Sequence, residues 1–260
     1  MYVYKRLVDW VSARIIAYLS HPTGRYAPFF APPLEVWRAA LRPGDVILIE
    51  GNTRLSAIIK YLTQSTWSHA ALYIGDALGP EPGGGEARVL LEAEAGPGVI
   101  VVPLSKYARF HTRICRPVGL TDEERSRVVD FAVARIGTRY DSRRIVDLAR
   151  YMFPYPPVPI SWRRRLLAIG SGDPTKAICS ALIGEAFSSI RYPVLPERAT
   201  VGGKIYGVGP YVEHELQHIR QTGLYTPRDF DVSPYFNVVK PTIEAGFDHH
   251  KLRWSAEAGV

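Results

Sequence analysis

The sequence predicts an α+β fold in which helices pack against one antiparallel sheet. Three observations lead to this prediction. Short apolar strands between residues 46 and 116 are joined by Gly-containing loops, which is typical of antiparallel pairing. Helix start signals stand before residues 122 and 177, outside the run of strands. No apolar stretch reaches the roughly 18 residues that a membrane-spanning helix needs.

Composition limits the class of protein before any motif is considered. With 260 residues, of which 47% are hydrophobic, the chain can bury a sizeable core in one domain with additional segments. The net charge of +7 suits an anionic surface, but the chain has no nucleic-acid motif and no long basic run beyond 163–165. We therefore expect no nucleic-acid partner. The two cysteines do not indicate a disulfide framework, which fits the cytoplasm.

The segment 1–40 predicts an amphipathic helix followed by a Pro-rich connector. Leu7, Val11, Ile15 and Leu19 recur at four-residue steps and share one face of a helix. No small-residue cleavage site follows a continuous apolar core, so we do not expect a secretory signal. Two interpretations of the helix stay open. It packs on its own domain, or it lies on a membrane surface, peripheral to the inner membrane face.

The remaining elements follow in chain order. We expect strands at 46–49, 68–74, 88–94, 99–102 and 112–116. Thr53 is a candidate cap for a helix at 53–64, and Thr121 with Glu124 forms a capping box for a helix that Gly137 stops. Other helices are expected at 34–40, 143–151, 161–169, 177–190 and 211–220. The predicted domain is 41–193 with a helical insertion at 142–175, and a C-terminal extension, 194–260, packs on it.

Cys179 is the candidate nucleophile. It falls at the expected start of the helix 177–190. Unpaired backbone N–H groups and the positive end of the helix dipole favour a thiolate at such a position. The apolar residues of this helix suit a buried structural cysteine equally well, so the residue alone leaves both interpretations open. Cys115, in the expected strand 112–116, is interpreted as an inert buried thiol.

A nucleophilic cysteine needs a base, and His69 is the best placed of the seven histidines. It lies at the start of the expected strand 68–74, between small residues. A carboxylate on the strand 88–94 can fix the tautomer of its ring if the two strands pair. Glu92 and Glu94 point to the same face of that strand, so alternation does not choose between them.

Three segments resemble the permuted papain-like hydrolases, in the YiiX-type branch related to NlpC-like cell-wall peptidases and lecithin retinol acyltransferase-like enzymes. The segments are 43–47 with 68–75, 91–93 with 98–104, and 178–182. His69 precedes Cys179, which is the order of the circularly permuted branch. The resemblance covers roughly residues 41–190. It implies the circularly permuted papain-like (NlpC-like) fold, with the cysteine helix packed on the sheet.

The resemblance implies roles for three residues: Cys179 as nucleophile, His69 as base and then acid, and Glu92 as the residue that orients His69. The implied activity is that of a cysteine hydrolase or acyltransferase, that is an amidase, a thiol protease or a lipid acyl hydrolase, acting through a thioester. It implies no cofactor and no metal. The expected substrate is a peptide amide or an acyl lipid. The family often has an acidic residue after Cys-Ser, where this chain has Ala181, so substrate preference does not follow.

A zinc metalloprotease is the sharpest alternative hypothesis, because the chain contains the pattern H-E-x-x-H. The pattern is formed by His214-Glu215-Leu216-Gln217-His218. On a helix its two histidines would share a face and bind zinc, with His249 or His250 as a third ligand. Charged flanking positions argue against a buried zinc helix. A catalytically inactive binding module is the third hypothesis.

Overall fold

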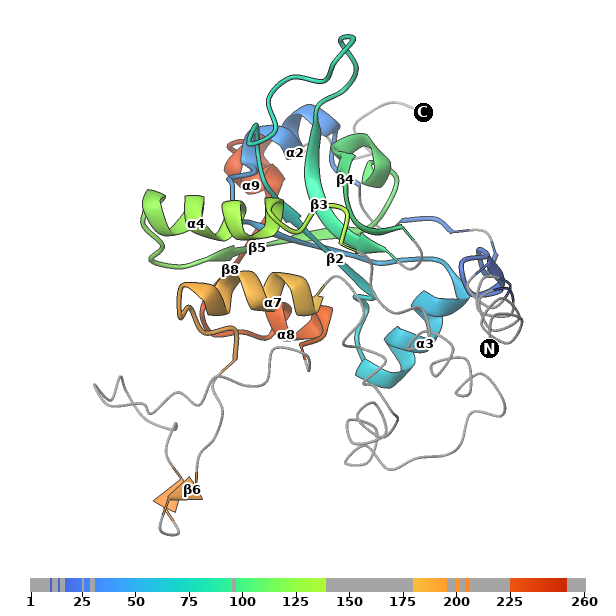
Figure 1. The fold of residues 1–260 in the computed structure, drawn as a ribbon. Coiled ribbons are helices and arrows are strands. Elements are labelled where there is room, and N and C mark those ends of the chain that lie inside the picture. Colours follow the sequence, from blue (N-terminus) through green and yellow to red (C-terminus); the bar gives the residue numbers. More distant parts are fainter. Residues whose placement is uncertain are drawn as a thin grey trace.

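A computed structural model of the chain describes residues 10, 14, 17–24, 26–28, 31–94, 97–138, 180–195, 200–201, 204–205 and 225–251. Its centre is a six-stranded sheet in the order β4-β3-β2-β1-β5-β8 (Figure 1). Every adjacent pair in this sheet is antiparallel. The predicted α+β class with an antiparallel sheet is therefore confirmed.

The elements have the following bounds. The strands of the sheet are β1 (Val46–Ile49), β2 (His69–Tyr73), β3 (Arg88–Glu94), β4 (Gly98–Pro103), β5 (Thr112–Pro117) and β8 (Phe236–Val239). The helices are α2 (Leu34–Ala40), α3 (Arg54–Thr63), η1 (Leu104–Tyr107), α4 (Asp122–Val133), α7 (Ser180–Ser189), α8 (Pro227–Asp231), α9 (Pro241–Glu244) and η5 (His249–Lys251). A separate two-stranded ladder joins β6 (Thr200–Val201) and β7 (Lys204–Ile205).

Two apolar clusters cover the two faces of the sheet. On the α7 face, residues such as Leu48 and Leu72 pack with side chains from α4, α7 and α8. On the η1 face, residues such as Ile47 and Leu90 pack with side chains from α2 and η1. Alternation along each strand assigns its residues to the two faces. Because β1 is central and covered on both faces, all four of its residues are buried.

Local sequence signals set the ends of several elements. The Oγ1 atom of Thr53 accepts a hydrogen bond from the backbone N–H of Ser56 at 3.1 Å, which caps α3. Thr121 and Glu124 exchange hydrogen bonds between side chain and backbone, so the predicted capping box at the start of α4 is confirmed. Cys115 is fully buried, as predicted.

Three of the observed strands were not predicted from the sequence: β6, β7 and β8. The segment that forms β8 pairs with β5 and adds a sixth strand to the sheet. Several predictions lie outside the described residues: the helices at 143–151, 161–169 and 211–220, the insertion 142–175, and residues 177–179 of the cysteine helix.

The N-terminal helix is described at only a few positions. Leu19 is completely buried, whereas Trp10 and Tyr18 are exposed. Leu7, Val11 and Ile15 lie outside the described residues. The buried Leu19 supports packing of the apolar face against the domain, and contact with a membrane stays a prediction. Within the described part of the chain, no helix has the length and apolar character needed to cross a bilayer.

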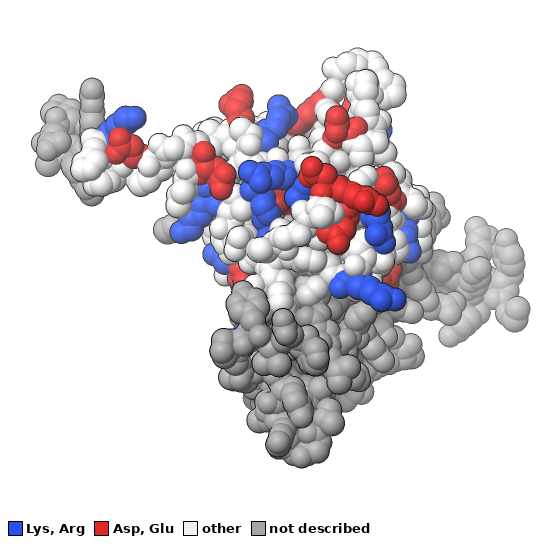
Figure 2. All heavy atoms as spheres, turned by 90° about the vertical axis from the view of Figure 1, so that its left-hand side faces the viewer, with Lys and Arg blue, Asp and Glu red and all other residues white. Residues whose placement is uncertain are grey.

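Charges of both signs share the surface. Figure 2 shows acidic and basic side chains next to one another on the side of the molecule that faces left in Figure 1. Among the described residues of this side, the surplus of seven positive charges therefore does not create a surface of one sign. An attraction to a polyanion would need a continuous basic area, which these described residues do not form.

Helix α7 is held on the sheet by close packing at its start and middle. The Oγ atom of Ser180 donates a hydrogen bond to the backbone oxygen of Tyr225 at 2.7 Å. Leu182 and Phe187 are buried in the cluster of the α7 face. Gly184 faces the ring of Tyr225, and a Cβ atom at this position would come within 2.3 Å of Tyr225 Cδ2. The helix can therefore approach Tyr225 this closely only with glycine at position 184.

The substitution Gly184→Ala tests this packing. We expect it to lower the free energy of unfolding by about 1 to 3 kcal/mol, the usual cost of overpacking a core, measured by urea unfolding. Gly85→Ala is the matched control, because the nearest atom to its Cβ would be Glu81 Cβ at 3.9 Å. Equal losses in the two variants would contradict the close contact between α7 and Tyr225.

Candidate active site

His69 is the first residue of β2, at the end of the sheet. Its position is set by the residue before it: the N–H of Ser68 donates to the backbone oxygen of Ile49, and Ser68 Oγ accepts from the N–H of Gly51 at 2.9 Å. A Cβ on Gly51 would lie 2.2 Å from Ser56 Oγ. Glycine therefore lets the end of β1, the start of β2 and the start of α3 come together beside His69.

Glu92 lies on the neighbouring strand β3 and is fully buried. Its Oε2 atom is 2.8 Å from Nε2 of His69. Because an ionised carboxylate only accepts hydrogen bonds, the proton of a neutral His69 ring is assigned to Nε2, and Nδ1 carries the lone pair. Glu94, on the same face, accepts a hydrogen bond from Lys106. The geometry thus distinguishes two carboxylates that alternation left equivalent, while the catalytic role of Glu92 stays a prediction.

Two further residues contact Glu92 and were not predicted from the sequence. Lys106 donates to Glu92 Oε1, and the hydroxyl of Tyr107 donates to Glu92 Oε2 at 2.5 Å. Both residues belong to η1, directly after the segment 98–104 that carries the family resemblance. A lysine and a tyrosine after a strand form no recognisable spacing pattern. Only the turn of η1 brings them back over β3.

The partners of Glu92 decide its charge. Burial alone would raise the pKa of this carboxyl. The hydrogen bond and charge of His69, together with those of Lys106, outweigh burial and lower the pKa to about 2. For Lys106, burial favours the neutral amine, but Glu92 and Glu94 outweigh it and raise the pKa of the ammonium group. Glu92 is therefore ionised over the whole neutral range.

A pocket of about 290 Å³ opens beside His69. Its polar lining includes Glu94 and Ser68, and α3 forms part of its wall. Its apolar lining comes from Ile49, Leu55, Ile59, Tyr107 and Phe110. The pocket is at the small end of ligand sites, so it has room for one apolar group next to the imidazole.

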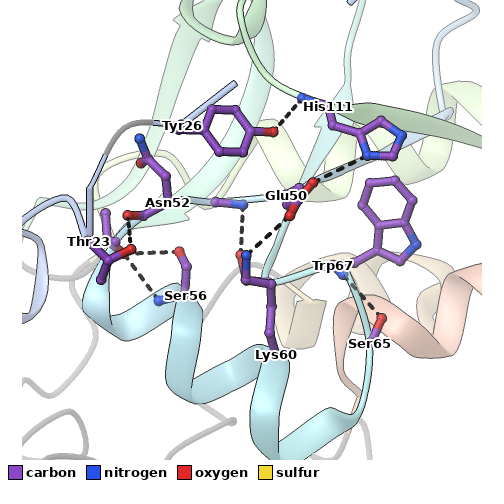
Figure 3. Close-up of polar contacts among 12 residues, drawn as sticks. Thr23, Tyr26, Glu50, Asn52, Ser56, Lys60, Ser65, Trp67 and His111 are labelled. Carbon is purple, nitrogen blue, oxygen red and sulfur yellow. Dashed lines mark hydrogen bonds and ion pairs between the residues drawn. The ribbon is translucent and has the colours of Figure 1, made fainter. Parts of the chain in front are cut away.

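A second histidine–glutamate pair lies at the same end of the sheet. Figure 3 shows Glu50 between Lys60 and His111, with Trp67 beside the His111 ring. The distance from His111 Nδ1 to Glu50 Oε2 is 3.3 Å, and Lys60 Nζ is 3.3 Å from Glu50 Oε1. All three side chains are partly exposed. No pattern in the sequence assigns His111 a role, and this pair is longer and more exposed to solvent than the pair of His69 and Glu92.

The structure brings together two of the three predicted site residues. Cys179 lies outside the described residues, and the next residue, Ser180, begins α7. The segment 214–218 of the zinc hypothesis also lies outside them. His249 and His250 are exposed beside Asp248, and a metal-binding role for either one stays a prediction.

The chain is similar to known proteins. Residues 40–152 match the sequence profile of a family described as permuted papain-like amidase enzyme, YaeF/YiiX, C92 family. The probable lipoprotein peptidase YaeF of Escherichia coli strain K12 is 24% identical over 176 residues, which span 62% of this chain and 60% of that protein. A crystal structure of metalloprotein yiiX from Escherichia coli O157:H7 covers 77% of this chain and 97% of that chain, at 16% identity and a TM-score of 0.44. The family match contains His69 and Glu92 and ends before Cys179.

The charge of Glu92 should appear in the pH dependence of stability. Its pKa is about 2 in the folded protein against an ordinary 4.5, so its contribution is complete above about pH 4.5 and is lost as the pH falls towards 2. Between pH 6 and 3 we expect wild type to lose about 2 kcal/mol of unfolding free energy relative to Glu92→Gln. Urea unfolding at each pH measures this, and Glu94→Gln is the control. Parallel curves for wild type and Glu92→Gln would contradict an ionised, stabilising Glu92.

Proposed function

From the match of residues 40–152 to the profile of the permuted papain-like amidase family, we propose that this chain is a cysteine hydrolase that cleaves an amide or ester through a thioester on Cys179. The observation that carries the proposal is the hydrogen bond from His69 to the buried, ionised Glu92. A polar side chain that orients the imidazole is the arrangement that activates the nucleophile in catalytic triads, and a carboxylate has this role in the Ser-His-Asp triad.

The proposed reaction assigns one proton path. Nδ1 of His69 takes the proton of the Cys179 thiol, and the thiolate attacks the carbonyl carbon of the substrate. Backbone N–H groups at the start of the cysteine helix hold the resulting oxyanion. The imidazolium then gives its proton to the leaving amine or alcohol as the C–N or C–O bond breaks. Water, deprotonated by His69, hydrolyses the thioester and restores the thiol.

The fold limits how Cys179 and His69 can meet. The side chains of His69 and Glu92 point to the η1 face of the sheet, whereas α7 packs on the opposite face. His69 is the first residue of β2, and α7 packs against this strand. In the proposed enzyme the thiol therefore meets the imidazole past the end of β2 rather than across the sheet. Ser180, tied to Tyr225, anchors the start of the helix for this approach.

The substrate bond is proposed to be a peptide amide. The relative YaeF is named a probable lipoprotein peptidase, which favours an amide over an acyl ester as the bond cleaved here. The pocket beside His69 can receive one apolar group of such a substrate. Transfer of the acyl group to an acceptor other than water would use the same thioester and is the alternative outcome.

Selective alkylation tests the proposal. In native protein near pH 7, iodoacetamide should label Cys179 and spare Cys115, because burial raises the pKa of the Cys115 thiol and closes access to it. His69→Ala should slow labelling of Cys179 by at least about 100-fold. The rate is measured by mass spectrometry of the two cysteine peptides.

The matched control is His111→Ala, which removes the histidine of the other pair with a glutamate. Its labelling rate should stay within about twofold of wild type. The proposal fails if Cys179 in wild type reacts no faster than in denatured protein, or if the His69 and His111 variants behave alike.

A further inference from the structure

Two arrangements of histidine, glutamate and lysine lie at this end of the sheet, and they differ in burial. In one, the side chain of Glu50 is 25% exposed, so solvent can stabilise its charge. In the other, the side chain of Glu92 has no exposure at all. A carboxylate without water takes up a proton unless donors and positive charge surround it. The second arrangement therefore depends on its protein partners in a way that the first does not.

Glu92 receives its partners from two elements. Nε2 of His69 reaches it from β2, and the ammonium of Lys106 and the hydroxyl of Tyr107 reach it from η1. Lys106 also binds a second carboxylate of β3, that of Glu94. His69 must be free to change protonation during catalysis, so it cannot be the constant source of positive charge. Lys106 is the one cation among these neighbours whose charge does not change in the neutral range.

Lys106 also bridges the two carboxylates of β3. It binds Glu92 and Glu94 at the same time, and Glu94 lies on the wall of the pocket that His69 lines. Leu104 and Tyr107 are buried and fix η1 against the sheet. Lys106 therefore extends from a turn that is fixed in place. Its ammonium group binds Glu94, while Glu92 contacts the imidazole of His69.

We propose that Lys106, assisted by Tyr107, is a positioning residue that keeps Glu92 ionised and aimed at His69, and so sets the pH at which Cys179 becomes reactive. The effect on Cys179 rests on the proposed function, whereas the effect on Glu92 does not. Lys106 acts through Glu92 and takes no part in bond making or breaking.

The experiment has one readout for each part. Carbon-13 NMR of the Glu92 carboxyl, assigned with Glu92→Gln, follows its titration without any catalysis. In Lys106→Met we expect this titration to move up by at least about one pH unit. The second readout is the alkylation rate of Cys179 as a function of pH. In Lys106→Met the acid limb of this profile should move up by about one pH unit, which is a roughly tenfold loss of rate at pH values below the limb.

Controls separate positioning from general loss of structure. Lys106→Arg keeps the positive charge and should restore both readouts to near wild type. Lys60→Met removes the lysine of the exposed arrangement around Glu50 and should change neither. If Lys106→Met does not fold by circular dichroism, Tyr107→Phe removes one donor from Glu92 and should shift the titration in the same direction.

The outcomes are distinguishable from failure of the proposed function. An unchanged Glu92 titration in folded Lys106→Met overturns the inference, as do equal shifts in the Lys60 variant or no rescue by arginine. A normal pH profile for Cys179 in Lys106→Met, alongside loss of labelling in His69→Ala, overturns the link to reactivity and leaves the cysteine hydrolase standing. An inert Cys179 in wild type overturns the hydrolase, while the NMR titration still decides the role of Lys106 towards Glu92.

Discussion

A buried carboxylate that must stay charged is the constraint around which the site is arranged. The side chain of Glu92 is fully buried, and its negative charge is kept by donors from His69, Lys106 and Tyr107. Removing one partner of a buried charge is costly, because the remaining charge has no solvent to replace the lost interaction. The same donors that make Glu92 stable in the core also fix which nitrogen of His69 carries its proton.

The fold supplies these donors from segments far apart in the chain. The sheet places β2 beside β3, and η1 turns back over them after β4. The close approach at Gly51 holds the start of β2, and with it His69, against β1 and α3. On the α7 face of the sheet the apolar core holds the predicted cysteine helix, and on the η1 face a second apolar cluster lies beside the charged groups around Glu92. In the proposed enzyme, the cysteine helix and His69 meet at the end of β2.

Local sequence signals predicted much of the fold, and long-range contacts account for the rest. The caps at Thr53 and Thr121 and the apolar run of β1 are local, and the structure has them where the sequence indicated. β8 was missed because four residues carry little periodicity and gain their strand conformation from β5. Side-chain alternation left two carboxylates on β3 equivalent. Lys106 binds both carboxylates because η1 turns back over β3, and no spacing pattern in the sequence predicts this turn.

The most direct measurement is the tautomer of the His69 ring, read from the nitrogen-15 shifts of its side chain by long-range proton–nitrogen NMR. The Cys179→Ser variant at about pH 8 keeps the ring neutral, so that one nitrogen carries the proton and the other does not. A proton on Nε2, donated to Glu92, with Nδ1 left as the base, is the result expected from the 2.8 Å contact. A neutral ring protonated on Nδ1 would contradict the orientation of His69 by Glu92, and with it the assignment of His69 as the base for Cys179.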